Sequence, residues 1–197
     1  MTMTSLTIDP QQTALVLIDL QLGITGSGRA LGPHTAAEVV QNAARLTAKF
    51  RALGAAVVLV RVAFQPDYKD LLDPPSDVPS QFSAAALPAN WADLTPELGS
   101  SPTDIIITKR QWSAFYGTEL DLQLRRRGVR TIVLGGIATN IGVESTARNA
   151  HDHGYAQVFA EDATTGLGAE AHQFAFKNIF ARIGRVRSTA EILAALP

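Results

Sequence analysis

The sequence predicts an α/β fold with a mainly parallel sheet that helices cover on both faces. The first observation is that short apolar runs rich in β-branched residues alternate with longer segments of helical periodicity. The second is that these runs are continuously apolar, which is typical of strands buried on both faces. Such an alternation places helices on each side of one parallel sheet. With 197 residues, the chain is expected to form a single domain over residues 1–197.

Six runs are predicted as strands: residues 14–18, 56–60, 105–107, 131–134, 157–160 and a short strand at Val186. Apolar residues at helical spacing predict a first long helix from His34 or Thr35 to about Leu53. The same spacing predicts helices over 118–127, 140–153 and 169–183. Ser188, with Glu191 at the third helical position, has the pattern of a capping box and begins a last helix.

Two segments depart from this alternation. Residues 21–33 contain four glycines and are predicted as a loop. Residues 63–103 hold seven of the ten prolines and little sustained periodicity. A structureless loop of that length is uncommon in a compact domain, so we predict short helical turns within it, such as one at 95–98. An excursion of this kind covers a site or meets another subunit, and the sequence favours neither role.

Composition excludes several classes of function. A net charge of −1 offers no basic surface for nucleic acid or for an anionic membrane, and no apolar run approaches the roughly 18 residues of a membrane span. Residues 1–12 are polar and lack the apolar centre of a signal peptide, so we expect a cytoplasmic protein. The chain has no cysteine, which excludes disulfides, thiolate metal sites and a cysteine nucleophile.

No pattern in the sequence indicates a metal or a cofactor. The histidines are His34, His151, His153 and His172. None has the spacing of zinc ligands, so we expect them at the surface or at helix ends and predict no metal site. Residues 135–142 lack the three spaced glycines of a dinucleotide-binding turn, and we predict no cofactor. Ser145 lies one turn into the predicted helix and should point away from the opening.

Polar and glycine residues follow three of the predicted strands. Asp19 comes directly after the first strand, Lys109 follows the third, and a glycine-rich turn at 135–142 follows the fourth. The carboxyl ends of parallel strands share one edge of a sheet, so these groups should converge there. Burial raises the pKa of Asp19 and a nearby Lys109 lowers it, and their balance decides whether Asp19 is an acid or a base. The alternative is a buried ion pair that only joins two strand ends.

The turn after the fourth strand has the composition of a ligand site. Thr139 or Asn140 is expected to cap a helix whose first turn contains Gly142. The N–H groups and the dipole at such a helix start attract anions. The alternative is that Gly142 only satisfies packing or turn geometry.

Four stretches together resemble the isochorismatase-like hydrolases, a superfamily that also holds nicotinamidases and N-carbamoylsarcosine amidases. They are residues 17–21, Lys109 with 113–120, residues 136–148 and residues 160–163, and the match covers nearly the whole chain. The resemblance implies a three-layer, doubly wound, Rossmann-like α/β fold with six parallel strands. It also implies a homo-oligomer, a dimer or tetramer, and a cis peptide between Ile137 and Ala138.

The resemblance also assigns roles. The amidase branch of the superfamily uses Asp, Lys and Cys; Asp19 and Lys109 match the first two, and Gly142 stands at the cysteine position. That branch often holds a metal after the second strand, where residues 61–66 offer no such ligands. The isochorismatase branch likewise has glycine instead of cysteine. By that likeness, Asp19 would protonate the methylene carbon of a vinyl ether while Lys109 and helix N–H groups hold the substrate carboxylates.

Further substrate contacts are expected from Gln21, Trp112, Phe115, Ile137, Ala138, Thr139 and Ile141. Trp112 and Phe115, with Tyr116, have a second interpretation as core or subunit-interface aromatics. The leading hypothesis is a hydrolase of a small carboxylated molecule. The alternatives are a catalytically silent protein that binds a small acid in the same pocket, and a purely structural oligomer subunit.

Overall fold

The computed structural model describes residues 6–78 and 87–197. Its centre is a six-stranded parallel sheet in the order β3-β2-β1-β4-β5-β6. The strands are β1 Thr13–Ile18, β2 Ala56–Val62, β3 Ile105–Lys109, β4 Thr131–Ile137, β5 Ala156–Thr165 and β6 Arg185–Arg187. The α/β class and the parallel sheet predicted from the apolar runs are confirmed.

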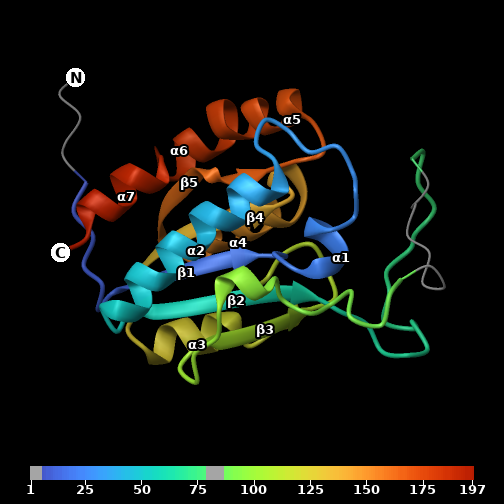
Figure 1. The fold of residues 1–197 in the computed structure, drawn as a ribbon, viewed down its shortest axis with the longest axis horizontal. Coiled ribbons are helices and arrows are strands. Elements are labelled where there is room, and N and C mark those ends of the chain that lie inside the picture. The colour runs from blue at the N-terminus through green and yellow to red at the C-terminus, as the bar shows by residue number, and fades with distance from the viewer. Residues whose placement is uncertain (1–5, 79–86) are drawn as a thin grey trace.

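Helices cover both faces of this sheet. They are α1 Leu22–Thr25, α2 Ala36–Ala52, η2 Pro96–Leu98, α3 Leu120–Arg126, η3 Thr139–Val143, α4 Glu144–Asp152, α5 Ala169–Phe174, η4 Ala175–Phe180, α6 Ala181–Ile183 and α7 Thr189–Ala195. Figure 1 shows α2 in front of the sheet and α3 and α4 behind it. The protein therefore has the three layers of a doubly wound fold.

The position of β1 at the centre of the sheet explains why its sequence is apolar throughout. Its alternate side chains belong to two separate cores: Leu15 and Leu17 pack in the cluster that includes α2 and α7. Val16 and Ile18 pack in the cluster that includes α3, α4 and η4. Because both faces of β1 are covered, every residue of the strand is buried.

Two helix starts follow directly from local chemistry. Thr35 and Glu38 form a capping box at the start of α2, and Ser188 and Glu191 form another at the start of α7. The capping box predicted at Ser188 is therefore confirmed. Of the two candidates for the start of the first long helix, Thr35 is the cap, which leaves the His34 side chain available for other contacts.

The structure differs from the expected elements in three places. Residues 22–25 form the short helix α1 within the segment predicted as a loop. Strand β5 continues to Thr165 because a register shift between Leu134 and Gly136 lets the end of β4 pair with Thr164 and Thr165. The long helix predicted over 169–183 is divided into α5, the π-helical turn η4 and α6.

The strand order reverses between β1 and β4, whose carboxyl ends lie side by side, with Ile18 opposite Gly136. Open α/β sheets bind ligands at such a switch point. Residues 63–103 begin at this same edge, and part of the segment extends away from the sheet on the right of Figure 1 before the chain returns to pack against α2 at η2. The predicted turn at 95–98 is present as η2. Within the described ranges, no helix is long and apolar enough to cross a membrane.

Candidate active site

A cavity of about 1300 Å³ opens at the carboxyl edge of the sheet. The three groups that the strand ends were expected to bring together all line it: Asp19, Lys109 and Gly142. Asp19 follows β1, Lys109 ends β3, and Gly142 lies in the helical turn η3 after β4. The parallel topology therefore produces the predicted convergence.

Asp19 and Lys109 form a buried ion pair in this cavity. Lys109 Nζ lies 2.8 Å from Asp19 Oδ2, and the two side chains are only 3% and 8% exposed, respectively. Lys109 Nζ also donates a hydrogen bond to the backbone carbonyl of Gln111 at 3.1 Å. The second carboxylate oxygen, Asp19 Oδ1, is buried and has no hydrogen-bond partner among the described residues. One face of the Asp19 carboxyl is thus held by the lysine and the other is uncommitted.

The balance between burial and charge at Asp19 is decided by burial. Desolvation raises the pKa of Asp19 from 3.8 to about 6, although the nearby Lys109 charge and its hydrogen bond lower it. A carboxyl with a pKa close to neutrality can give up and take back a proton under ordinary conditions. Burial therefore brings the pKa of Asp19 closer to the range in which a carboxyl exchanges protons near neutral pH.

Gly142 packs closely beside this carboxyl. A Cβ atom at position 142 would lie 3.2 Å from Asp19 Oδ2 and 3.1 Å from Ile18 Cγ2. A larger side chain at this position would therefore start in contact with the Asp19–Lys109 pair. With glycine, the cavity has no nucleophile at the position where the resemblance expects a thiol.

The turn between β4 and η3 has the expected shape but not the expected cap. The Ile137–Ala138 peptide is cis, as the resemblance implied. Among the residues that the structure describes, no side chain caps the helical segment at its start, so the predicted capping by Thr139 or Asn140 is wrong. The Thr139 hydroxyl lies instead 2.8 Å from Nδ1 of His172, and this contact to α5 takes the place of the cap.

The expected substrate contacts divide into two groups. Trp112, Ile137, Ala138 and Ile141 line the cavity, whereas Gln21, Phe115 and Thr139 are not among its lining residues. Trp112 is 65% exposed, and Tyr116, which also lines the cavity, is 69% exposed. Their exposure places these two aromatics at the cavity surface, not in the core.

Gln21 and Phe115 have structural roles that explain their absence from the cavity. The Gln21 amide accepts a hydrogen bond from Val62 N at 2.8 Å and donates to the carbonyls of Val62 and Trp91. It thereby joins the segment after β1 to the end of β2 and to the 63–103 excursion. Phe115 is buried and stacks on Tyr155 and His153, so the core interpretation of this aromatic is correct.

Several cavity residues were missed from the sequence. Two arginines, Arg29 and Arg110, line it, and Arg110 Nε also contacts Asp70 Oδ2 at 2.5 Å. Ser145 lines the cavity as well, so the expectation that it points away is wrong. The excursion contributes Phe64 and Trp91, whose rings stack at 6.0 Å, which supports the site-covering role for this segment. Of these residues, only Arg110 could have been predicted at the cavity from the sequence, because it directly follows Lys109.

His151 and His153 are exposed as expected, but His172 differs from the expectation of a surface or helix-end position. His172 is 1% exposed, so it is a buried residue and not a surface one. Its Nε2 atom lies 3.0 Å from Glu161 Oε1, and His34 Nε2 lies 3.0 Å from the same oxygen. The hydrogen bond from His172 lowers the pKa of Glu161, with a smaller contribution from His34. Glu161 is therefore an ionised carboxylate between two imidazoles.

Comparison with known proteins places the chain in a family. A family model described as "Isochorismatase domain" matches residues 13–191. The chain is 56% identical over 191 residues to the "Uncharacterized isochorismatase family protein YecD" of Escherichia coli O157:H7, covering 97% of this chain and 100% of that protein. It is 33% identical over 213 residues to the ureidoacrylate amidohydrolase RutB of Methylorubrum extorquens, covering 95% and 84% of the two chains.

A solved structure gives the same result at the level of the fold. An isochorismatase family protein from Burkholderia thailandensis superposes with a TM-score of 0.90 at 43% sequence identity, over 98% of each chain. Family model, sequence relatives and fold agree over almost the whole chain. This chain is therefore a member of the isochorismatase family of hydrolases, and one that contains no cysteine.

Proposed function

We propose that this protein hydrolyses a small carboxylated vinyl ether, with Asp19 as the general acid and without a thiol nucleophile. The observation that carries the proposal is the Asp19 carboxyl itself: it lines the cavity, burial raises its pKa to about 6, and Oδ1 is uncommitted. The glycine at position 142 supports a route without a covalent intermediate, because acyl-enzyme chemistry needs a nucleophile there.

The proposed reaction begins with transfer of the Asp19 proton to the methylene carbon of the vinyl ether. The π electrons of the double bond form the new C–H bond and leave an oxocarbenium ion at the other vinyl carbon. Water adds to that carbon and returns one proton to the Asp19 carboxylate. In the resulting hemiketal the bond between the former vinyl carbon and the ether oxygen breaks, and the hydroxyl proton passes to that oxygen, which releases an alcohol and a keto acid. Asp19 thus ends the cycle protonated.

Cationic groups around the cavity suit a substrate that carries carboxylates. Lys109 lies beside Asp19, and Arg29 and Arg110 line the same cavity. The helical segment from Thr139 presents its N-terminal end at this edge, where the dipole favours an anion. A substrate carboxylate near Lys109 would offset the lysine charge and allow the pKa of Asp19 to rise further in the complex.

A second candidate function is a catalytically silent protein that binds a small acid. The observation that favours it is the Asp19–Lys109 ion pair at 2.8 Å, which also occurs as a purely structural feature of strand ends. Isochorismate, a carboxylated ring that carries a vinyl ether of pyruvate, serves as the probe for both candidates. Pyruvate release measured with lactate dehydrogenase, beside heat measured by titration calorimetry, separates them. Catalytic release supports the hydrolase, whereas saturable binding without pyruvate supports the binding protein.

The pH dependence of the reaction follows from the raised pKa of Asp19. A general acid must be protonated, so its active fraction falls as the pH rises through the pKa of about 6. We expect kcat/KM for isochorismate to fall about tenfold for each pH unit above that value. Initial rates of pyruvate release between about pH 5 and about pH 8, a window that spans the raised pKa, test this prediction. A rate that rises with pH across this window would assign Asp19 the role of a base instead.

Replacing Lys109 with glutamine separates its two roles. Loss of the positive charge removes the influence that lowers the pKa of Asp19. The falling limb of the pH profile should therefore move to higher pH by about one pH unit or more. KM should rise about tenfold, because a charge-assisted contact to the substrate carboxylate is lost. An unchanged KM and an unchanged limb would show that Lys109 neither binds substrate nor tunes Asp19.

A further inference from the structure

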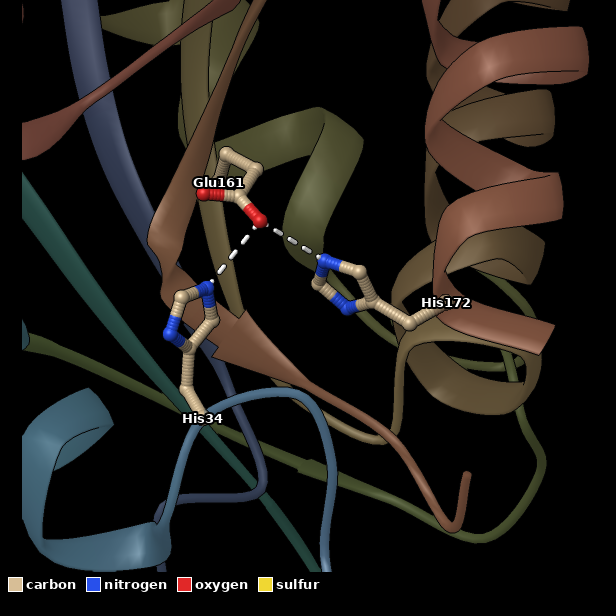
Figure 2. A group of neighbouring side chains, drawn as sticks. All are labelled: His34, Glu161 and His172. Carbon is tan, nitrogen blue, oxygen red and sulfur yellow. Dashed lines mark hydrogen bonds and ion pairs between the residues drawn. The ribbon is translucent and has the colours of Figure 1, made fainter. Parts of the chain in front are cut away.

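A second cluster of polar side chains lies outside the cavity and takes no part in the proposed reaction. Figure 2 shows the imidazole rings of His34 and His172 directed at one oxygen of Glu161. Each Nε2 atom lies 3.0 Å from Glu161 Oε1, and one ligand atom from each residue lies within 4.8 Å of the other two. Among the described residues, this is the group of His, Asp and Glu side chains arranged closely enough to share an ion.

We propose that His34, Glu161 and His172 form a binding site for a zinc-type divalent ion. Two imidazoles and one carboxylate are a ligand set that zinc uses when three protein groups hold the ion and a fourth position stays open. Imidazole nitrogens also favour the later first-row divalent ions over magnesium and calcium. The proposal is independent of the hydrolytic function proposed above.

Two of the three separations between ligand atoms fit such an ion after a small adjustment, and the third, between the two histidines, is within 4.8 Å. Zinc bonds of 2.0–2.2 Å in a tetrahedron separate the ligand atoms by about 3.3 Å. The two N–O separations of 3.0 Å are a few tenths of an ångström shorter. The Glu161 side chain is 35% exposed, so its carboxylate has room to move outward and admit the ion. The His34 side chain is also partly exposed, at 26%.

Contacts around the cluster hold two of the ligands in place before any ion binds. The second ring nitrogen of His172, Nδ1, lies 2.8 Å from the Thr139 hydroxyl, and both residues are buried. Metal-binding histidines ordinarily have such a partner on the other nitrogen, which sets the tautomer and the ring orientation. The Thr165 hydroxyl donates to the carbonyl oxygen of His34 at 2.6 Å and ties the His34 loop to β5.

The cluster joins parts of the chain that are far apart in sequence. His34 precedes α2, Glu161 lies in β5 and His172 lies in α5; Glu161 is 127 positions after His34. No local spacing rule could detect such a site, and the proposal therefore replaces the expectation of a metal-free protein. Because Thr139 begins η3, an ion held here would also brace the turn that lines the catalytic cavity.

Calorimetric titration with zinc chloride tests the site. The full chain, without a histidine tag, is first stripped with a chelator and dialysed. We expect one zinc ion per chain with a Kd of about 1 µM or tighter. Glu161→Gln and His34→Gln each remove one ligand and should weaken binding at least about a hundredfold. Thr139→Val removes only the partner of His172 and should weaken binding about tenfold.

His151→Gln is the matched control, because His151 is an exposed histidine on α4 that is not part of the cluster. Its affinity should equal that of the parent, and zinc should raise Tm in the parent and the control but not in His34→Gln. His34 is partly exposed in a loop, so this variant remains informative even if Glu161→Gln fails to fold. The proposal would be overturned if the parent protein binds zinc with a Kd weaker than about 100 µM. It would also be overturned if the parent, Glu161→Gln and His34→Gln bind zinc with equal affinity.

Discussion

Asp19→Asn is expected to reduce kcat for vinyl-ether hydrolysis about a thousandfold, within the range attributed to general acid catalysis. Asparagine keeps the shape of the side chain and its place beside Lys109, but its amide cannot supply a proton to carbon. KM should change little or fall, because Lys109 no longer shares its charge with Asp19. Steady-state pyruvate release from isochorismate, with separate kcat and KM values, provides the measurement.

The control for this variant is Asp104→Asn. Asp104 forms an ion pair with Arg51 at 2.7 Å and is only 3% exposed, so its carboxylate matches that of Asp19 in burial and in distance to its cation, although Arg51 is more exposed than Lys109, at 21%. It precedes β3, at the end of that strand opposite Lys109. Asp104→Asn should lower stability yet leave kcat within about twofold of the parent. A folded Asp19→Asn protein that keeps more than about a tenth of the parent kcat would exclude Asp19 as the acid.

Gly136→Ala is expected to lower the free energy of unfolding by about 4 kcal/mol or more, which is exceptional for a single substitution. Gly136 has φ of +125°, and an added Cβ would lie 2.1 Å from the carbonyl oxygen of Ile18 and 2.6 Å from its nitrogen. These are backbone atoms of the neighbouring strand, so a side-chain rotation cannot relieve the overlap. The ends of β1 and β4 would have to separate, and Asp19 follows directly after Ile18.

Urea denaturation followed by circular dichroism measures this loss, and Gly168→Ala is the control. Gly168 has φ of −173°, and no atom of the described ranges lies within 4 Å of its added Cβ, so alanine there should change stability by less than about 1 kcal/mol. If Gly136→Ala and Gly168→Ala unfold at the same urea concentration, the close approach of β1 and β4 does not determine stability at this edge.

The fold was predictable where burial leaves a clear pattern. The run 14–18 is apolar because helices cover both faces of β1, and the capping box at Ser188 depends on only two local side chains. The extension of β5 to Thr165 was not predictable, because its second half contains polar residues that pair with β4 only after a register shift. Helix α1 was not predicted, because Gly23 within it lowers helix propensity. The backbone N–H of Gly23 is bound by the carbonyl of Trp91, a residue distant in sequence.

The site was predictable to the extent that topology alone brings residues together. Asp19 and Lys109 end parallel strands, so their convergence follows from the fold class. The direction of a side chain depends on tertiary packing, which the sequence does not show. Gln21 and Phe115 were therefore expected to contact substrate, but Gln21 binds backbone groups and Phe115 packs in the core. The His34–Glu161–His172 cluster depends on three distant segments and left no local signal.

The most direct test of the proposed chemistry is hydrolysis of isochorismate in water labelled with heavy oxygen. Protonation of the methylene carbon followed by water attack at the vinyl carbon breaks the bond between that carbon and the ether oxygen. The ring product should then keep its original oxygen and carry no label by mass spectrometry. Label in the ring product would place the attack of water at the ring carbon and contradict the role assigned to Asp19, as would the absence of any ring product.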